Sequence, residues 1–408
     1  MKPLRLLLVF AGSSRAVVPA VLIATAGTVI AAVSDPSSST WVGKAQNTAS
    51  YTTVFAFAVA GCLSVVAGYV AGADLARDEH TLLRRGMRPV SVLVALRALG
   101  DLAWLWAGLL TALAAAFGRT IVVGGGFRAD SWSPVVLAMC SVAATYASGM
   151  LAGAMLRHRV GLVVVAPLPY VATLWSSGVL SMSEQAPMQF LIAPYVDQSW
   201  FPGYVPAPGA FGALAGYVAG AAAVFLACTI AFLQPRLRRR PPGARLLLAA
   251  SVVTLLAAVQ VVGLGGPSSF GRPNPAGVLC TSGPAPVCVW GDQERQLPVW
   301  VAAARDTALA IEGLPVDAPR FVQTFVPLSG AADVEIQTLN PLPSVDQLRT
   351  AMFDFIAQEL LNSCIPPQRQ QRETRQDLID LMSARVSNQQ TRTAGSSDFT
   401  TITAGRCG

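Results

Sequence analysis

The chain has 408 residues, enough for two or three soluble domains by length alone. Hydrophobic residues make up 53%, charged residues only 12%, and the mean hydropathy is +0.51, whereas soluble domains carry roughly 25% charged residues. Residues 1–266 hold 18 basic and 8 acidic side chains, and the shorter segment 267–408 holds 11 and 14. This split excludes a single soluble globule, a disordered chain and a fibrous repeat. It predicts a multi-span membrane protein with a water-facing C-terminal domain.

Lysine and histidine are almost missing from the chain. The only lysines are Lys2 and Lys44, and the only histidines are His80 and His158. A phosphate loop of the GxxxxGK[ST] type needs a lysine, and none follows residue 44. Nucleophile–histidine triads and HExxH zinc sites need histidines that are not available here. We therefore expect no enzymatic activity, cofactor or metal in this chain.

The first 15 residues predict an interfacial helix rather than a cleaved signal peptide. The apolar run Leu6–Gly12 is short, Arg15 interrupts it, and a longer apolar segment follows at once. Lys2 and Arg5 would lie among lipid head groups while the leucines face the acyl chains.

Seven apolar runs follow, each near the 20 residues needed to cross a hydrocarbon core. They are Ala16–Val33, Tyr51–Ala73, Ala98–Gly118, Pro134–Leu156, Val160–Leu180, Ala210–Leu233 and Leu246–Gly266. Only the third contains a charge, Asp101, three residues from its start. Because a charge is tolerated best near a span end, an interfacial helix start is favoured over a polar group facing a translocation path.

The basic residues of the loops predict the orientation. With a cytoplasmic N-terminus, inner segments hold 15 Lys and Arg, and outer loops hold three: Lys44, Arg119 and Arg128. An odd number of spans then places residues 267–408 outside the cell.

Glycines spaced four apart predict close packing between membrane helices. The patterns are Gly68 with Gly72, Gly149 with Gly153, and the run Gly212, Gly216 and Gly220.

The loop after the second span, Asp74–Pro89, is dense in charge, and Gly86 and Pro89 would end a helix there. Its charged residues include Arg77, Asp78, Glu79, Arg84, Arg85 and Arg88. Two readings are open: a short helix lying along the membrane that docks a cytosolic partner, or a solvated connector whose arginines only fix the topology.

The layout of residues 1–235 resembles the membrane subunit of ABC-2-type exporters. An interfacial helix precedes six spans, the charged loop lies between spans two and three, and the tight hairpin Arg157–Arg159 joins spans four and five. A long aromatic outer loop precedes span six. The resemblance implies that Arg77–Arg88 is the coupling helix contacting an ATP-binding subunit. It also implies that residues 185–205 dip back into the membrane, and that a second permease subunit, identical or different, completes the transporter.

Two features depart from that family: the seventh span and the outer domain after it. The expected organisation is an interfacial helix (1–15), a six-helix membrane domain (16–235), a basic linker with the seventh span (236–266), and an extracytoplasmic domain (267–408). The basic run Arg236–Arg245 is read as a topology signal, with attraction to anionic lipid as the alternative.

The outer segment predicts a small α+β domain. A Gly/Pro/Ser-rich linker spans Pro267–Pro286. Expected strands are Val287–Trp290, Arg320–Val326 and Val334–Leu339. Expected helices begin at Pro298, at Ser344 with a capping box to Gln347, and near Gln368, and Leu348, Met352, Phe355 and Ile356 form a core-facing stripe on the second.

Four cysteines lie in this outer domain, and three lie within spans, where a thiol acts as a small apolar group. An even set in an oxidising compartment predicts two disulfides, for which three connectivities exist. The local pairs Cys280–Cys288 and Cys364–Cys407 are favoured, since a zinc site lacks the CxxC spacing and a nearby histidine.

Two carboxylate pairs in the outer domain, Asp292 with Glu294 and Asp333 with Glu335, have the spacing of paired acid/base groups. Ordinary solvated faces give the same pattern and are favoured.

These observations lead to one functional hypothesis and two rivals. The chain would be the permease subunit of an ATP-binding-cassette exporter that moves a hydrophobic or amphipathic substrate outward. Its partners would be an ATPase subunit, a second permease subunit and membrane lipid, with no nucleic acid. The first rival is a membrane-anchored sensor or immunity protein whose outer domain binds a ligand. The second, a membrane enzyme, is disfavoured because intramembrane aspartyl chemistry needs two aspartates, and only Asp101 lies in a span.

Overall fold

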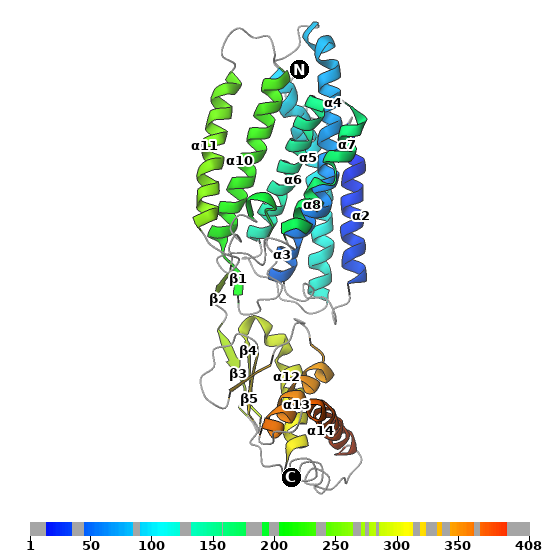
Figure 1. Ribbon diagram of the computed structural model, residues 1–408, viewed down its shortest axis with the longest axis vertical. Helices are drawn as coiled ribbons and strands as arrows, with labels where there is room; N and C mark the ends of the chain where they lie inside the picture. Colours follow the sequence, from blue (N-terminus) through cyan, green and yellow to red (C-terminus); the bar gives the residue numbers. More distant parts are fainter. Residues whose placement is uncertain are drawn as a thin grey trace. The chain divides into compact units, whose positions relative to one another are not determined.

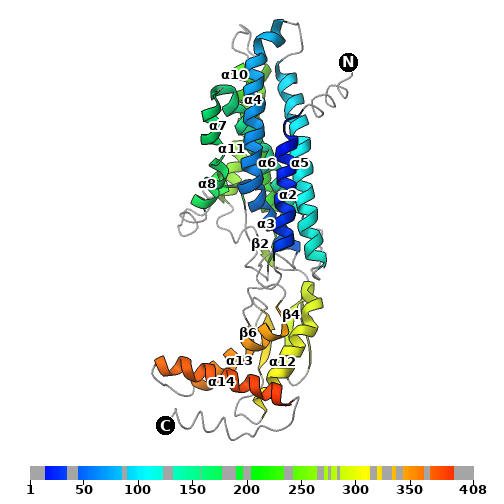
Figure 2. The same cartoon turned by 90° about the vertical axis from the view of Figure 1, so that its right-hand side faces the viewer.

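The structure, a computed structural model, forms two compact units. It describes residues 14–34, 45–84, 90–122, 132–156, 158–176, 190–195, 204–233, 242–263, 271–273, 277–282, 285–312, 319–323, 333–336, 343–362 and 368–389. The helical unit comprises 1–34, 41–200 and 204–272, and the C-terminal domain is formed chiefly by 273–408. In both Figure 1 and Figure 2, the helical unit is a bundle of long helices running side by side.

The helices of the helical unit follow the apolar runs of the sequence. They are α2 (Val17–Val33), α3 (Ala45–Phe55), the π-helix η1 (Ala56–Ala60), α4 (Gly61–Arg84), α5 (Val90–Val122), α6 (Trp132–Leu156), α7 (Arg159–Val165), α8 (Leu168–Trp175), α10 (Pro208–Leu233) and α11 (Pro242–Gly263). Helices suit these segments because hydrocarbon offers no hydrogen-bond partners, so each segment must pair its own backbone groups.

Four helical segments of the described chain are long and apolar enough to cross a membrane: Asn47–Arg77, Val90–Val122, Trp132–Leu156 and Pro208–Leu233. Shorter apolar helices cover Val17–Val33, Val160–Trp175 and Ala249–Gly263, where three further spans are expected. The chain therefore has the helices of a membrane protein. The number seven, the cytoplasmic N-terminus and the side of the C-terminal domain stay predictions.

The fifth expected span is not one continuous helix. A turn at Ala166–Pro167 separates α7 from α8. Proline lacks the backbone N–H that a helix interior needs, and its ring collides with the preceding turn, so Pro167 can begin α8 but cannot continue α7. Residues 177–180, the end of the expected span, lie outside the described residues.

The second expected span is longer than its apolar run. We call α3, η1 and α4 together the helical rod, since they follow one another without a break from Ala45 to Arg84. Residues 74–84 are the last turns of α4, which corrects the expectation of a separate helix lying along the membrane there. The helix continues beyond the apolar segment because no helix-breaking glycine or proline occurs between Asp74 and Arg84.

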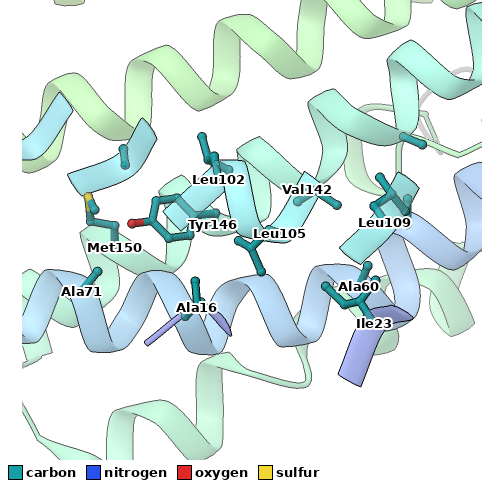
Figure 3. Close-up of a cluster of buried hydrophobic side chains, with 14 of the residues drawn as sticks. Ala16, Ile23, Ala60, Ala71, Leu102, Leu105, Leu109, Val142, Tyr146 and Met150 are labelled. Carbon is teal, nitrogen blue, oxygen red and sulfur yellow. The ribbon is translucent and has the colours of Figure 1, made fainter. Parts of the chain in front are cut away.

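Helices α4 and α6 pack backbone to backbone through their glycines, as predicted. A Cβ atom on Gly68 would lie 2.0 Å from the carbonyl oxygen of Tyr146, and one on Gly153 would lie 2.0 Å from that of Tyr69. Figure 3 shows the neighbouring apolar core, in which Leu105 of α5, Tyr146 of α6 and Ala71 of α4 belong to one buried cluster. The third glycine run differs, because only Gly220 meets a neighbour, Thr254 of α11, while Gly212 and Gly216 face open space.

The C-terminal domain is a four-stranded sheet with helices, and it confirms the α+β expectation. The strands β3 (Val278–Cys280), β4 (Val287–Trp290), β5 (Arg320–Gln323) and β6 (Asp333–Ile336) lie in that order. Strand β3 is antiparallel to β4, and β5 is parallel to both of its neighbours. The helices are α12 (Leu297–Ile311), α13 (Val345–Asn362) and α14 (Gln368–Gln389), preceded by the short 3-10 helix η5 (Gly291–Gln296). Two strands that were not expected, β1 (Tyr204–Pro206) and β2 (Gly271–Pro273), form a separate two-stranded sheet.

The core of this domain confirms the predicted stripe on α13. Leu348, Met352 and Ile356 are fully buried, and the first two pack with Trp300 of α12 and Phe321 of β5. Phe355 is partly buried against the same cluster. Apolar residues therefore join the sheet to two helices around one core.

The predictions of a capping box at Ser344 and of a Cys280–Cys288 disulfide are confirmed. The amide of Gln347 donates to Ser344 Oγ (3.2 Å), and the amide of Ser344 donates to Gln347 Oε1 (3.0 Å), which is the reciprocal pattern of a capping box. Cys280 and Cys288 form a disulfide between directly paired positions of β3 and β4. Cys364 and Cys407 lie outside the described residues.

Candidate functional site

Four of the six predicted coupling residues lie at one end of the helical rod. Arg77 is exposed near the end of α4, and Asp78, Glu79 and Arg84 belong to the same helix, with side chains outside the described part. Arg85 and Arg88 follow in residues that the structure does not describe. The backbone therefore places the first four of these residues on a continuation of a membrane helix.

One turn before Arg77, an ion pair joins α4 to the start of α2. Arg15 Nη1 lies 3.3 Å from Asp74 Oδ2, and the Arg15 side chain is 71% exposed. Exposed pairs of this kind contribute less than about 1 kcal/mol. The pair therefore marks which helix ends are neighbours and adds little to the stability.

Asp101 is the centre of a buried polar cluster. Its carboxylate accepts hydrogen bonds from Ser14 Oγ (2.5 Å), Tyr146 Oη (2.8 Å) and Arg97 Nε (3.0 Å). The side chain is 1% exposed, and α5 begins at Val90, well before it. Asp101 is therefore not at a helix start, contrary to the expectation, since the apolar run at Ala98 is preceded by further turns of the same helix. Its position at the membrane interface stays a prediction.

The Asp101 cluster holds three helices together. Ser14 precedes α2 and also accepts the backbone amide of Ala16 (3.0 Å), Arg97 lies on α5, and Tyr146 lies on α6. A buried carboxylate that is compensated by a cation and two hydroxyls is stable, but removal of one partner leaves an uncompensated charge. The arrangement is a structural clamp, in which all three donors are directed to the Asp101 carboxylate.

A cavity of about 270 Å³ lies between the helical rod, α6, α8 and α10. The apolar part of its lining consists of Phe57, Val65, Ala144, Val165, Leu168, Pro169, Ala172, Leu191, Ile192, Pro194, Val218, Ala221 and Phe225. Three hydroxyl side chains complete the wall: Thr145, Ser148 and Tyr217. The helical rod, α6, α7, α8, α10 and the segment 190–195 thus surround one space.

The hydroxyls of this wall are bonded to the protein backbone. Thr145 Oγ1 donates to a carbonyl on its own helix at 2.9 Å, and Ser148 Oγ donates to Thr145 O at 2.8 Å. Tyr217 Oη donates to Leu191 O at 2.9 Å. Since each hydroxyl proton is directed to a carbonyl, the cavity presents a chiefly apolar surface to its contents.

The segment expected to dip into the membrane, 185–205, forms one side of this cavity in its described part. Residues 190–192 are helical, and Phe190 is buried against Phe211 and Val218 of α10. The Tyr195 hydroxyl lies 3.2 Å from Ser176 Oγ at the end of α8. Residues 185–189 and 196–203 lie outside the described residues, so the re-entrant path stays a prediction.

Two irregular elements border the cavity, and the sequence indicated only one of them. Phe57 is supplied by the π-helix η1, while Val165 and Leu168 flank the break at Ala166–Pro167. Pro167 and Pro169 are visible in the sequence as a signal for a break. The π-turn has no such signal, since Ala56–Ala60 reads as ordinary apolar helix.

The remaining candidate groups line neither the Asp101 cluster nor the cavity. Cys62, Cys140 and Cys228 are free, half-buried thiols, and the described residues contain no cluster of three side chains suited to a metal ion. In the C-terminal domain, Asp333 is paired with Arg320 through two hydrogen bonds of 2.5 Å, and this hydrogen bonding raises the pKa of Arg320. The Asp333 carboxylate therefore serves strand pairing between β5 and β6.

Comparison of the chain with protein-family models, with curated proteins and with solved structures gives no match.

Proposed function

We propose that the chain is the permease subunit of an ATP-binding-cassette exporter that moves a hydrophobic or amphipathic substrate outward. ATP would be hydrolysed by a separate subunit docked at Arg77–Arg88. A second permease subunit, identical or different, would complete the transporter. The layout of residues 1–235 provides the starting argument, and the geometry of the helical rod supports it.

The observation that carries the proposal is the continuity of the helical rod. It supplies Phe57 and Val65 to the cavity and runs on without a break to Arg84. A helix transmits displacement along its axis because its backbone hydrogen bonds are all internal. A partner that pulled on the arginine-rich end would therefore move one wall of the apolar cavity.

The neighbouring helices would convert that displacement into a change of the cavity. The glycine contacts lock α4 to α6, so these two walls would move together. The break between α7 and α8 interrupts regular helix hydrogen bonding, which is where helices bend. Movement of the α4–α6 pair against α8 would thus open or close the cavity.

Co-purification of the ATPase tests the docking site. The full chain is purified from its native membranes, and the ATPase subunit that accompanies it is quantified. We expect the double charge reversal R84E/R85E to remove the ATPase, because it inverts the charge at the end of the rod. The matched control R238E/R239E makes the same change in the other arginine cluster and should leave the ATPase bound.

Equal loss in both variants would contradict the docking role, since it would reflect net charge alone. Absence of any ATPase from the wild-type preparation, together with specific binding of a ligand by the outer domain, would favour the sensor hypothesis instead.

A further inference from the structure

The cavity between the helical rod, α6, α8 and α10 has a lining suited to hydrocarbon. Its hydroxyls are engaged with backbone carbonyls, and the rest of its wall is aliphatic or aromatic. A water molecule held in such a space would lack the two to four polar partners that buried water needs, and apolar cavities accordingly bind apolar guests.

The mouth of the cavity opens among side chains that themselves face an apolar medium. Leu168 and Ile192 line the cavity and are also 52% and 40% exposed on the outside of the helical unit. Their neighbours along α8, Val171 and Leu174, are exposed as well. In a membrane protein this surface is bathed by acyl chains, so hydrocarbon is the molecule that reaches the mouth.

The size of the cavity limits what can enter. Sites that enclose drug-sized ligands measure about 300–1,000 Å³, whereas this cavity measures about 270 Å³. The space therefore accommodates one hydrocarbon chain segment and is too small for both chains of a two-chain lipid. With its hydroxyl groups already bonded, the cavity provides no recognition of a polar head group.

We propose that this cavity binds the hydrocarbon chain of a single-chain amphiphile, such as a fatty acid or a lysophospholipid, whose head group stays outside. As a statement about cargo, the inference rests on the proposed exporter function and names the class of molecule that the exporter handles. As a statement about binding, it needs no ATPase.

Photolabelling of the full chain in phospholipid nanodiscs tests the site. The probe is a fatty acid with a diazirine near the end of its chain, and labelled residues are identified by mass spectrometry. We expect labels on cavity residues, Ala172 of α8 and Ala221 of α10 among them. An excess of unlabelled lysophosphatidylcholine of equal chain length should reduce the labelling at least fivefold, since the head group is not recognised.

Two substitutions on one helix give a matched comparison. Ala221→Trp would fill the cavity and should abolish its labelling, whereas Ala219→Trp, on the exposed face of α10, should leave the labelling unchanged. The smaller change Ala221→Leu should reduce labelling partially and serves if the tryptophan variant does not fold.

Equal labelling in the Ala221→Trp and Ala219→Trp variants, or labels confined to the outer face of α8, would overturn the inference. Labelling of the cavity by a two-chain diazirine phosphatidylcholine that is as strong as labelling by the fatty acid would also overturn it. If the cavity labels as expected while no ATPase associates with the chain, the exporter function fails and the chain-binding site stands. If the chain exports a substrate with ATP but the cavity is not labelled, the chain-binding site fails and the exporter function stands.

Discussion

The two units of this protein differ in which side chains they bury and which they expose. The helical unit buries glycine, alanine and hydroxyl side chains between its helices and exposes large apolar side chains along α2, α5, α8 and α11. In the described C-terminal domain, only Val278, Leu279, Val301 and Leu309 are large, apolar and exposed, and its core contains Trp300, Phe321 and Met352. Small residues bring membrane helices together because hydrocarbon outside gives no incentive to bury large apolar groups, whereas water does.

The use of charge differs in the same way. The helical unit places Asp101 inside, with a cation and two hydroxyls around it. The described C-terminal domain buries one carboxylate, that of Asp333, against Arg320. Its other ion pairs are partly exposed, and Arg349 bridges Asp306 of α12 and Asp346 of α13. The helical unit therefore surrounds its buried charge completely, whereas most charges of the C-terminal domain lie at partly exposed positions. The following substitutions test this contrast, from the largest expected effect to the smallest.

Loss of the Asp101 carboxylate should have the largest effect. D101A leaves the guanidinium of Arg97 buried without its counter-ion, and breaking a buried pair costs about 3–5 kcal/mol. We expect a large fall in the melting temperature of the detergent-solubilised chain. The control D74A breaks only the exposed pair with Arg15 and should cost less than about 1 kcal/mol. Similar melting temperatures for the two variants would contradict the clamp.

A side chain at a helix crossing should have the next largest effect. G153V places its Cβ 2.0 Å from the Tyr69 carbonyl oxygen, so α4 and α6 must separate. Overpacking of this kind costs about 1–3 kcal/mol. G212V makes the same change on the exposed side of α10, where nothing lies within 4 Å, and should be nearly neutral in thermal stability. A stable G153V variant would show that the close crossing is not required.

The disulfide Cys280–Cys288 should stabilise the C-terminal domain alone. For a loop of this length, the chain-entropy model gives about 2.5 kcal/mol. In the full chain, C280S/C288S should therefore raise hydrogen exchange in β4, β5 and α12 while exchange in α4 and α6 stays as in the wild type. Increased exchange in both units would show that the helical unit and the C-terminal domain unfold cooperatively.

The smallest expected effect is at the start of α13. S344A removes the hydroxyl that accepts the Gln347 amide, and the loss of such a cap costs about 1 kcal/mol. S383A, inside α14, removes a hydroxyl that donates to the backbone of its own helix, and it should change the free energy of unfolding by about a few tenths of 1 kcal/mol. Hydrogen exchange of the first turn of α13 measures the difference. Unchanged exchange in S344A would contradict the role of the cap.

Features of short sequence range were the predictable ones. The capping box at Ser344, the stripe on α13 and the Cys280–Cys288 pair each depend on residues within a dozen positions of one another. The glycines at 68, 72, 149 and 153 were predictable as packing residues because small residues spaced four apart on apolar helices allow two backbones to approach closely. Their partners, Tyr146 and Tyr69, were not.

Features that depend on distant residues could not be predicted. The environment of Asp101 is formed partly by Ser14 and Tyr146, which are far from it in the chain, so the sequence favoured an interfacial helix start. Strand β3 lies in a Gly/Pro-rich segment and is stabilised by pairing with β4, which local propensity does not encode. The cavity likewise needs five helical elements and residues 190–195, and the π-turn in one of these elements has no sequence signal.

ATP-driven transport into inside-out membrane vesicles tests the central claim most directly. The vesicles carry the chain and its associated ATPase, and the cargo is a fluorescent single-chain amphiphile added outside. The proposed function predicts ATP-dependent accumulation that is lost in R84E/R85E and retained in R238E/R239E. Accumulation that is independent of ATP, or that is the same in both variants, would contradict it.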